Sequence, residues 1–294
     1  VVSGRDLTKA YGNHVVLREV NLDVLRGEKV AFVGRNGEGK TTLVKMIMDH
    51  IPYEGTLKIG YNVNIGYFAQ NQADLLDPSL SVLDTIDQVA VGDIRKKIRD
   101  ILGAFLFSGE DVDKKVRVLS GGERTRLAMV RLLLEPYNVL ILDEPMTGLD
   151  PNQLEEIRDL IIRIGKNKTV LLSTHIMQEV EAICDRILVI DKGNLIADKP
   201  KSVFHHTGSG GMVLKVSFAP GNPTDWLSEI KGISQIKRDG NDSFRLLSLP
   251  GHDPRIALFE AAAGHHCPII ELREESNLED VFKELTGKNN SLHT

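Results

Sequence analysis

Cysteine is scarce in this sequence, whose 294 residues contain only Cys184 and Cys267. Two cysteines are too few for a disulfide framework, so we expect reduced thiols in a cytosolic protein. No stretch approaches about 18 consecutive apolar residues, the length of a membrane-spanning helix, so any role at a membrane is expected to pass through a partner. Basic residues are not in excess either, because the net charge is -5 and neither half of the chain is strongly basic. This balance argues against general affinity for nucleic acid, which requires a basic surface.

A glycine-rich loop is the most informative stretch that the sequence does contain. It runs from Gly34 to Thr41, follows the apolar run Lys29–Val33 and opens a helical pattern from Thr42 to His50. A strand, a glycine-rich turn and a helix in this order form a P-loop, in which backbone N–H groups and the positive end of the helix surround phosphate oxygens. Lys40 would reach the outer phosphates, and the Thr41 hydroxyl would bind Mg²⁺. The residues expected to hold a nucleotide here are Gly34, Arg35, Asn36, Gly37, Glu38, Gly39, Lys40, Thr41 and Thr42.

A second candidate anion site follows Leu119, where Ser120-Gly121-Gly122-Glu123 opens an amphipathic helix. Ser120 followed three residues later by Glu123 is a capping box, which is a sufficient structural explanation of this pattern. A capped helix start with two glycines also suits an anion, so the pattern leaves both interpretations open.

Two carboxylates, Asp143 and Glu144, end the apolar run that begins at Val139. Such a run is typical of a fully buried parallel strand, and open sheets bind ligands at the C-terminal ends of these strands. Asp143 suits water-mediated contact to Mg²⁺, and Glu144 suits activation of an attacking water. His175 ends a second apolar run, Thr169–Thr174, so we expect it at the same edge of the sheet.

In their order along the chain, these stretches resemble the motifs of ATP-binding-cassette ATPases, and the resemblance covers residues 1 to about 205. It implies an α/β P-loop NTPase fold of this type, hydrolysis of ATP to ADP and phosphate, and ATP and Mg²⁺ as cofactors. The matching motifs are Gly34 to Thr41 (Walker A), Gln70 (Q-loop), Leu119 to Glu123 (signature), Leu140 to Glu144 (Walker B), Asp150 (D-loop) and His175 (H-loop).

The resemblance also implies roles for single residues around the nucleotide. Tyr11 would stack on adenine, although its local sequence alone favours a plug at a sheet edge. Gln70 would contact Mg²⁺, together with Thr41 and Asp143, and would sense the γ-phosphate. His175 would contact that phosphate and complete the catalytic set with Glu144, Gln70 and Asp143.

A second copy of the chain is the partner that the resemblance implies at the nucleotide. In the head-to-tail dimer of the family, Ser120, Gly121 and Gly122 of one subunit close over the ATP held by the P-loop of the other. Glu123 stands where many members carry glutamine, which adds negative charge near the nucleotide.

The two parts of the chain resemble different groups within the family. Residues 1–145 are similar to the second cassette of the ABC-F subfamily, whose tandem ATPases act on ribosomes, as in Ile65–Gln70. Residues 146–294 are similar to exporter ATPases of the gliding-motility type, as in Ser173–Val180. Helical periodicity over residues 71–118 predicts a helical subdomain, the surface by which exporter cassettes usually grip their permease.

A change in composition predicts a second domain after the cassette. We expect the ATPase domain to span 1–206, a Gly/Ser-rich linker 207–211, an accessory domain 212–286 and a tail 287–294. The accessory segment shows the order strand, helix, strand, strand, helix, strand, which predicts a small α+β ferredoxin-like module. It resembles the C-terminal domain appended to many exporter ATPases.

Two functions follow from these resemblances. The first is the ATP-binding subunit of an ABC exporter, a dimer that drives a transmembrane permease and lies in the cytoplasm at the inner face of the cell membrane. The alternative is an ABC-F-like ribosome-associated translation factor. A second cassette and a charged helical linker would favour the alternative, whereas the single cassette and the C-terminal module of these 294 residues favour the exporter.

Overall fold

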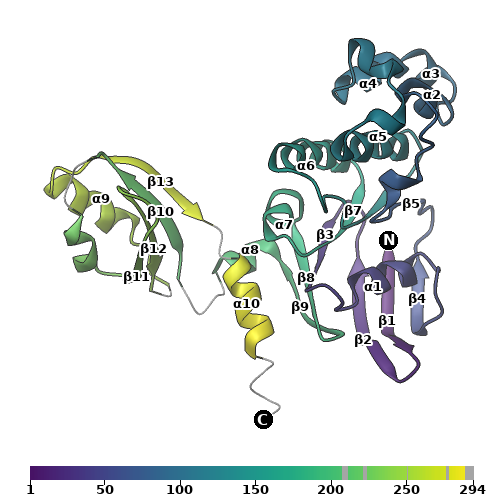
Figure 1. Cartoon of the computed structure of the whole chain (residues 1–294). Coiled ribbons are helices and arrows are strands. Elements are labelled where there is room, and N and C mark those ends of the chain that lie inside the picture. The colour runs from purple at the N-terminus through teal and green to yellow at the C-terminus, as the bar shows by residue number, and fades with distance from the viewer. Residues whose placement is uncertain (207–210, 221–223, 250, 276–277, 289–294) are drawn as a thin grey trace. The chain divides into compact units, whose positions relative to one another are not determined.

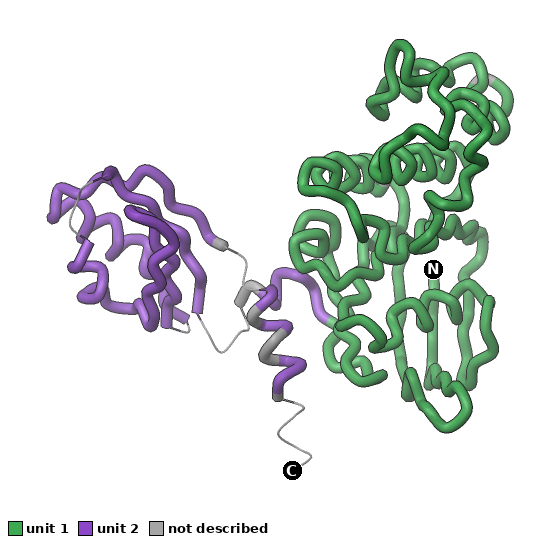
Figure 2. Tube along the Cα trace, in the orientation of Figure 1, with its two compact units in different colours: residues 1–198 green, residues 199–294 purple. Residues whose placement is uncertain are grey.

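The structure, a computed structural model, describes residues 1–294 except 207–210, 221–223, 250, 276–277 and 289–294. Its contacts divide the chain into two compact units, Val1–Asp198 and Lys199–Thr294 (Figure 2). This division falls before the boundary expected after residue 206, so α8 (Lys201–His206) belongs to the second unit. Of the expected linker 207–211 only Gly211 lies within the described residues, and of the expected tail only residues 287–288 do.

A six-stranded sheet forms the centre of the first unit (Figure 1). The strand order is β5-β6-β7-β3-β8-β9, and the pairs from β5 to β8 are parallel. Every residue of β6 and β7 is buried, as expected for strands covered on both faces. Because β3, β6 and β7 are parallel neighbours, the chain leaves all three at one edge of the sheet. The strands are β3 (Lys29–Val33), β5 (Ile65–Phe68), β6 (Val139–Asp143), β7 (Thr169–Thr174), β8 (Arg186–Asp191) and β9 (Asn194–Pro200).

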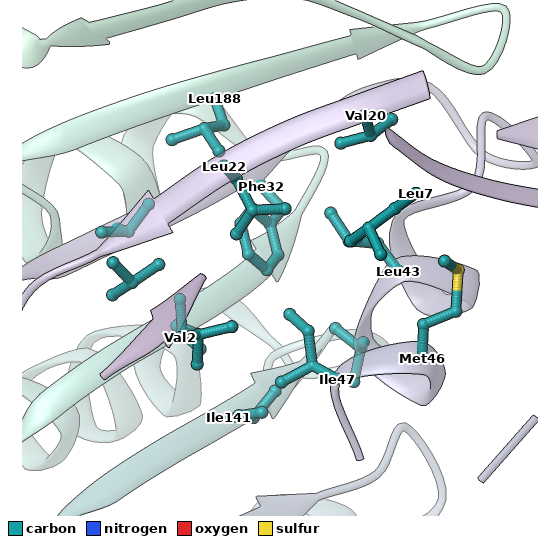
Figure 3. Packing of buried hydrophobic residues seen from close by; sticks show 14 of the residues in the cluster. Val2, Leu7, Val20, Leu22, Phe32, Leu43, Met46, Ile47, Ile141 and Leu188 are labelled. Carbon is teal, nitrogen blue, oxygen red and sulfur yellow. The ribbon is translucent and has the colours of Figure 1, made fainter. Parts of the chain in front are cut away.

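A three-stranded antiparallel sheet of order β2-β1-β4 packs against this centre through helix α1 (Lys40–Ile47). Its strands are β1 (Val2–Tyr11), β2 (His14–Val24) and β4 (Glu54–Ile59). Figure 3 shows Leu7 and Val20 of this sheet beside Leu43 of α1 and Phe32 of β3, all of which are fully buried. The same apolar core therefore fixes the strand before the glycine-rich loop and the helix after it.

Helices make up the rest of the first unit. Residues 71–118 form short helices, of which α2 contacts both α4 and α5. The predicted α/β class with a helical subdomain is therefore confirmed. The helical elements are η1 (Gln72–Leu75), α2 (Val82–Asp87), α3 (Asp93–Lys96), α4 (Ile98–Ala104), η2 (Gly109–Asp113), η3 (Val116–Val118), α5 (Gly121–Leu133), α6 (Pro151–Gly165) and α7 (Met177–Ile183).

The second unit contains a four-stranded antiparallel sheet of order β11-β12-β10-β13. Alternate residues of its strands, such as Leu214, Val216 and Leu246, form a core with Leu258 of α9. Its elements are β10 (Val213–Phe218), η4 (Asp225–Glu229), β11 (Ile233–Arg238), β12 (Ser243–Ser248), α9 (Arg255–Gly264), β13 (Ile269–Glu275) and α10 (Leu278–Lys288).

One element of the second unit differs from the prediction. The first helix expected in the accessory segment is a 3-10 helix, Asp225–Glu229. Trp226 anchors this element, because its ring meets that of Phe218 edge to face at 5.5 Å and stacks on His265 at 5.1 Å. Among the described helices of both units, none combines the length and apolar content of a membrane-spanning segment.

Candidate active site

The glycine-rich loop joins β3 to α1 through backbone that only glycine adopts easily. Gly37 has φ +88° and Gly39, the residue that caps α1, has φ +104°. A Cβ at Gly39 would also lie 2.7 Å from Cδ2 of Leu17, and one at Gly34 would lie 2.5 Å from the carbonyl oxygen of Ile190. These glycines are therefore required both by the backbone conformation of the loop and by the atoms packed against it.

Lys40 is buried, with its ammonium held inside the loop. Its Nζ donates to the carbonyl oxygens of Gly34 at 2.9 Å and Arg35 at 3.2 Å. It also lies 3.2 Å from Oε1 of Glu144, and the two side chains are only 5% and 8% exposed. A buried charge is tolerated when it is paired and hydrogen-bonded, and Lys40 meets both conditions.

Asp143, at the end of β6, receives hydrogen bonds from one side chain of helix α1 and one of strand β5. The Thr41 hydroxyl donates to Oδ1 at 3.1 Å, and the Tyr67 hydroxyl donates to Oδ2 at 3.4 Å. Burial, together with the Asp143 charge and this hydrogen bond, raises the pKa of Tyr67 to about 12, so the phenol stays protonated as a donor. Sequence reasoning missed Tyr67. The available signal was an aromatic hydroxyl in the strand that leads to Gln70, because a buried tyrosine usually finds a polar partner.

Glu144 leaves the sheet in an unusual backbone conformation. Its φ is +48°, in the left-handed region that non-glycine residues seldom adopt, and its N–H donates to the Ser173 carbonyl at 2.9 Å. Oε2 of Glu144 lies 2.8 Å from Nδ1 of His175, and the Thr147 hydroxyl donates to the same oxygen at 3.4 Å. The turn thus aims one carboxylate at an imidazole on one side and at Lys40 on the other.

A cavity of about 360 Å³ lies in front of these groups. It joins the glycine-rich loop to residues that lie far away in the sequence. Thr147 is part of its wall and was not predicted. The lining residues are Asn36, Gly37, Gly39, Lys40, Thr41, Thr42, Gln70, Glu144, Thr147 and His175.

The remaining residues of the predicted loop lie beside this cavity. Gly34 is buried behind Lys40, and the side chain of Arg35 is exposed. Glu38 accepts a hydrogen bond from the backbone N–H of Lys192, which ties the loop to the end of β8.

Other predicted residues are not brought to this cavity in the single chain. Of the described lining, neither Tyr11 nor Asp150 nor the segment 120–123 is a part. Tyr11 ends β1, is 51% exposed and lies 4.9 Å below the Lys9 ammonium.

Ser120 and Glu123 form the capping box that the sequence suggested, with Ser120 N–H donating to Glu123 at 2.7 Å and Glu123 N–H to Ser120 at 3.2 Å. Asp150 caps α6 in the same manner, with Gln153 as the reciprocal residue. The Gln153 side chain also lies against Gly122, so it connects the start of α5 to the start of α6.

The donors around Asp143 suit Mg²⁺. The Thr41 hydroxyl, the Asp143 carboxylate and the Gln70 amide are all oxygen ligands, and Thr41 already contacts Asp143. Within the described residues, no three His, Cys, Asp or Glu side chains gather into a metal cage. A few protein oxygens completed by substrate phosphates is the usual arrangement for this ion.

Comparison with known proteins finds similarity across the whole chain. Residues 17–147 match the family model described as ABC transporter. Nod factor export ATP-binding protein I of Ralstonia nicotianae is 31% identical over 98% of this chain and 94% of its own length. YdiF, named as an ATP-binding protein, of Bacillus subtilis is 41% identical, and ABC transporter F family member 5 of Arabidopsis thaliana is 34% identical, each over 66% of this chain. The chain spans about 30% of the length of these last two.

The fold is also similar to a solved structure. The dimeric ATP-binding cassette MJ0796, solved in a post-hydrolysis state bound to ADP and Pi, superposes with a TM-score of 0.59 at 24% identity. The match covers 68% of this chain and 98% of that one.

Proposed function

The chain belongs to the ABC transporter family and is an ATPase of the cassette type, and we propose that it works as the ATP-hydrolysing subunit of an exporter. The observation that carries hydrolysis is the contact of Glu144 with His175 at 2.8 Å, on the wall of the cavity that the glycine-rich loop also lines. It supports Glu144 as the carboxylate beside the position that we propose for the terminal phosphate. Supporting the exporter role, the relative named for Nod factor export aligns with both compact units.

Binding of ATP begins with groups that the loop already presents. Backbone N–H groups of the loop would surround the phosphates, and the N-terminus of α1 would add its positive end. Lys40 supplies the cation for the outer phosphates. Mg²⁺, held by Thr41, Asp143 and Gln70, would neutralise charge that develops on the phosphates. We assign Tyr11 to the adenine.

Hydrolysis then depends on the exchange of partners by Lys40. Once its ammonium binds phosphate, its attraction for Glu144 is shared, and Oε1 of Glu144 becomes available to accept a proton from water. The water oxygen forms a bond to the γ-phosphorus, the bond from that phosphorus to the bridging oxygen of ADP breaks, and Glu144 takes the proton. His175 keeps the carboxylate oriented through Oε2.

The residues outside the cavity support a dimer. Two helix starts lie outside the described lining of the cavity in their own chain. They contain Ser120, Gly121 and Gly122 at α5, and Asp150 at α6. We propose that a second copy, in a head-to-tail arrangement, brings them to the nucleotide, with Glu123 capping the helix that carries them. The similar cassette MJ0796 is itself dimeric.

The proposed partner of the dimer is a transmembrane permease, which would hold the protein at the cytoplasmic face of the cell membrane. ABC transporter F family member 5 of Arabidopsis thaliana, which matches 66% of this chain, supports the alternative, an ABC-F-like factor that acts on ribosomes. One fractionation separates the two roles. The tagged chain carries the Glu144→Gln substitution, which should trap complexes formed with ATP. In the presence of ATP, this variant should sediment with membranes that contain the permease. Recovery with ribosomes, and none with membranes, would favour the alternative.

A further inference from the structure

Glu179 is a buried carboxylate that the proposed hydrolysis does not use. It is the third residue of α7 and is 1% exposed. Its Oε2 accepts a hydrogen bond from the Thr174 hydroxyl at 2.5 Å, and its Oε1 has no hydrogen-bond partner among the described residues. Burial of a carboxylate with so few hydrogen-bond partners costs free energy, so Glu179 at this position lowers the stability of the fold.

The Thr174 hydroxyl, which donates to Glu179, takes part in a second hydrogen bond. It accepts from the backbone N–H of Ile176 at 3.1 Å. A threonine that binds the N–H two residues later fixes the chain between them, and here the residue between them is His175. Because Thr174 ends β7 and Ile176 caps α7, one hydroxyl ties together the chain before and after the histidine.

The histidine needs this restraint. Its side chain is 41% exposed, whereas the Glu144 carboxylate that it contacts at 2.8 Å is only 8% exposed. A half-exposed side chain on a turn loses rotamer freedom when it keeps one contact, so an ordered backbone beneath it lowers that cost. The hydrogen bond from Thr174 to Glu179 anchors this backbone to a buried side chain of α7.

We propose that Thr174 and Glu179 act as a positioning pair, which holds the His175 turn so that the imidazole stays against Glu144. The pair would thereby set the rate of hydrolysis without touching the nucleotide, because neither residue is part of the described cavity lining. This inference rests on the proposed ATP hydrolysis for its kinetic consequence, while its structural consequence can be measured without it.

The kinetic test compares variants of the full chain. Thr174→Val removes the hydroxyl at nearly constant shape, and Thr174→Ser restores it. We expect Thr174→Val to lower kcat about tenfold, the scale of one hydrogen bond, with KM for ATP changed less than about twofold. Thr174→Ser should recover most of kcat. The neighbouring Gln178 is exposed, so Gln178→Ala serves as the control and should match the wild type. Glu179→Leu should resemble Thr174→Val, and if it fails to fold, the threonine variants still decide.

A second background shows whether the pair acts through the histidine. In His175→Ala, Thr174→Val should cause no further loss of kcat. An equal tenfold loss there would show a general structural effect and would overturn the proposal. Wild-type turnover in Thr174→Val would also overturn it.

The structural readout is the imidazole NMR signal of His175, identified by its loss in His175→Ala. This signal should shift in Thr174→Val and return in Thr174→Ser, whether or not the protein hydrolyses ATP. If the wild type shows no hydrolysis but the signal responds, the proposed function fails and the positioning pair stands. An unmoved signal in Thr174→Val would contradict the pair itself.

Discussion

Nζ of Lys40 lies 3.2 Å from Oε1 of Glu144, and both side chains are almost completely buried. This contact joins the residue proposed to bind phosphate to the residue proposed to activate water. Two groups that must act in sequence therefore neutralise each other before the nucleotide arrives. In the proposed mechanism, binding of phosphate to Lys40 releases Glu144 in the same rearrangement.

The first prediction concerns this carboxylate. Glu144→Gln should lower kcat by at least about a hundredfold, because the amide cannot accept the proton of water. Nucleotide binding should persist, since Lys40 keeps its hydrogen bonds to Gly34 and Arg35. Steady-state ATPase assays and titration with a fluorescent ATP analogue measure the two effects. Glu155→Gln, at an exposed position of α6, is the control. Unchanged turnover in Glu144→Gln would remove Glu144 from the role of base.

The second prediction concerns pH. Burial raises the pKa of Glu179 above its ordinary value of 4.5, although the Thr174 hydrogen bond opposes the effect. A carboxyl whose folded-state pKa is raised contributes stability that is fully present below about pH 4.5 and is lost as pH rises through the folded-state pKa. The stability of the wild type relative to Glu179→Gln should therefore decrease from pH 4.5 towards pH 8. Urea unfolding of both proteins across this range measures the difference, and a constant difference would contradict the assignment.

How far the sequence predicts this site depends on whether a feature is local. The P-loop and the capping box of Ser120 and Glu123 are set by residues a few positions apart, and this capping box is present in the structure. The run Val139–Glu144 also predicted its strand, because burial on both faces leaves an uninterrupted apolar pattern.

The contacts between distant segments could not be predicted in the same way. The bond of Tyr67 to Asp143 exists because β5 and β6 are neighbours, and no local pattern encodes that neighbour. The left-handed turn at Glu144 is similar, since the sequence there carries no glycine to announce it. The roles assigned to Tyr11, Ser120 and Asp150 stay predictions, because they require a partner subunit or a nucleotide.

The third prediction tests packing at the start of α5. A Cβ at Gly122 would lie 2.4 Å from Cδ of Gln153, so Gly122→Ala must displace that side chain and its hydrogen bond to the Asp150 N–H. We expect a loss of about 1 kcal/mol in the free energy of unfolding, measured in urea. In a Gln153→Ala background the same substitution should be neutral or stabilising by up to about 1 kcal/mol, because alanine favours helix. Gly121→Ala is the control, since nothing lies within 4 Å of its Cβ position. An equal cost of Gly122→Ala in both backgrounds would argue against this contact.

The fourth prediction concerns assembly. If Ser120 and Gly122 complete the site of a second copy, ATP bound between the two must stabilise the dimer by linkage. Glu144→Gln should therefore dimerise at saturating ATP and Mg²⁺, and wild-type hydrolysis per subunit should rise with protein concentration. Light scattering gives the mass directly. A monomer at saturating ATP and Mg²⁺ would contradict the shared site. ADP in place of ATP is the negative control, and the protein should then stay monomeric.

The last prediction concerns the helical segment 71–118 and the permease. Residues 1–145 resemble ABC-F cassettes, yet the relative named for Nod factor export matches the chain along its whole length. The catalytic motifs are common to both groups, so the isolated chain should hydrolyse ATP. The outer face of 71–118 is a different matter, because the specificity of an interface depends on a few central contacts that must match one partner. We therefore expect hydrolysis without strong stimulation by a permease of the gliding-motility type.

The experiment compares the chain with a version whose residues 71–118 are replaced by an exporter segment. Both proteins are reconstituted with the same permease. Stronger stimulation of the replaced version is the expected result. Equal stimulation would mean that this segment already fits the permease, and the exporter role would then account for the whole chain.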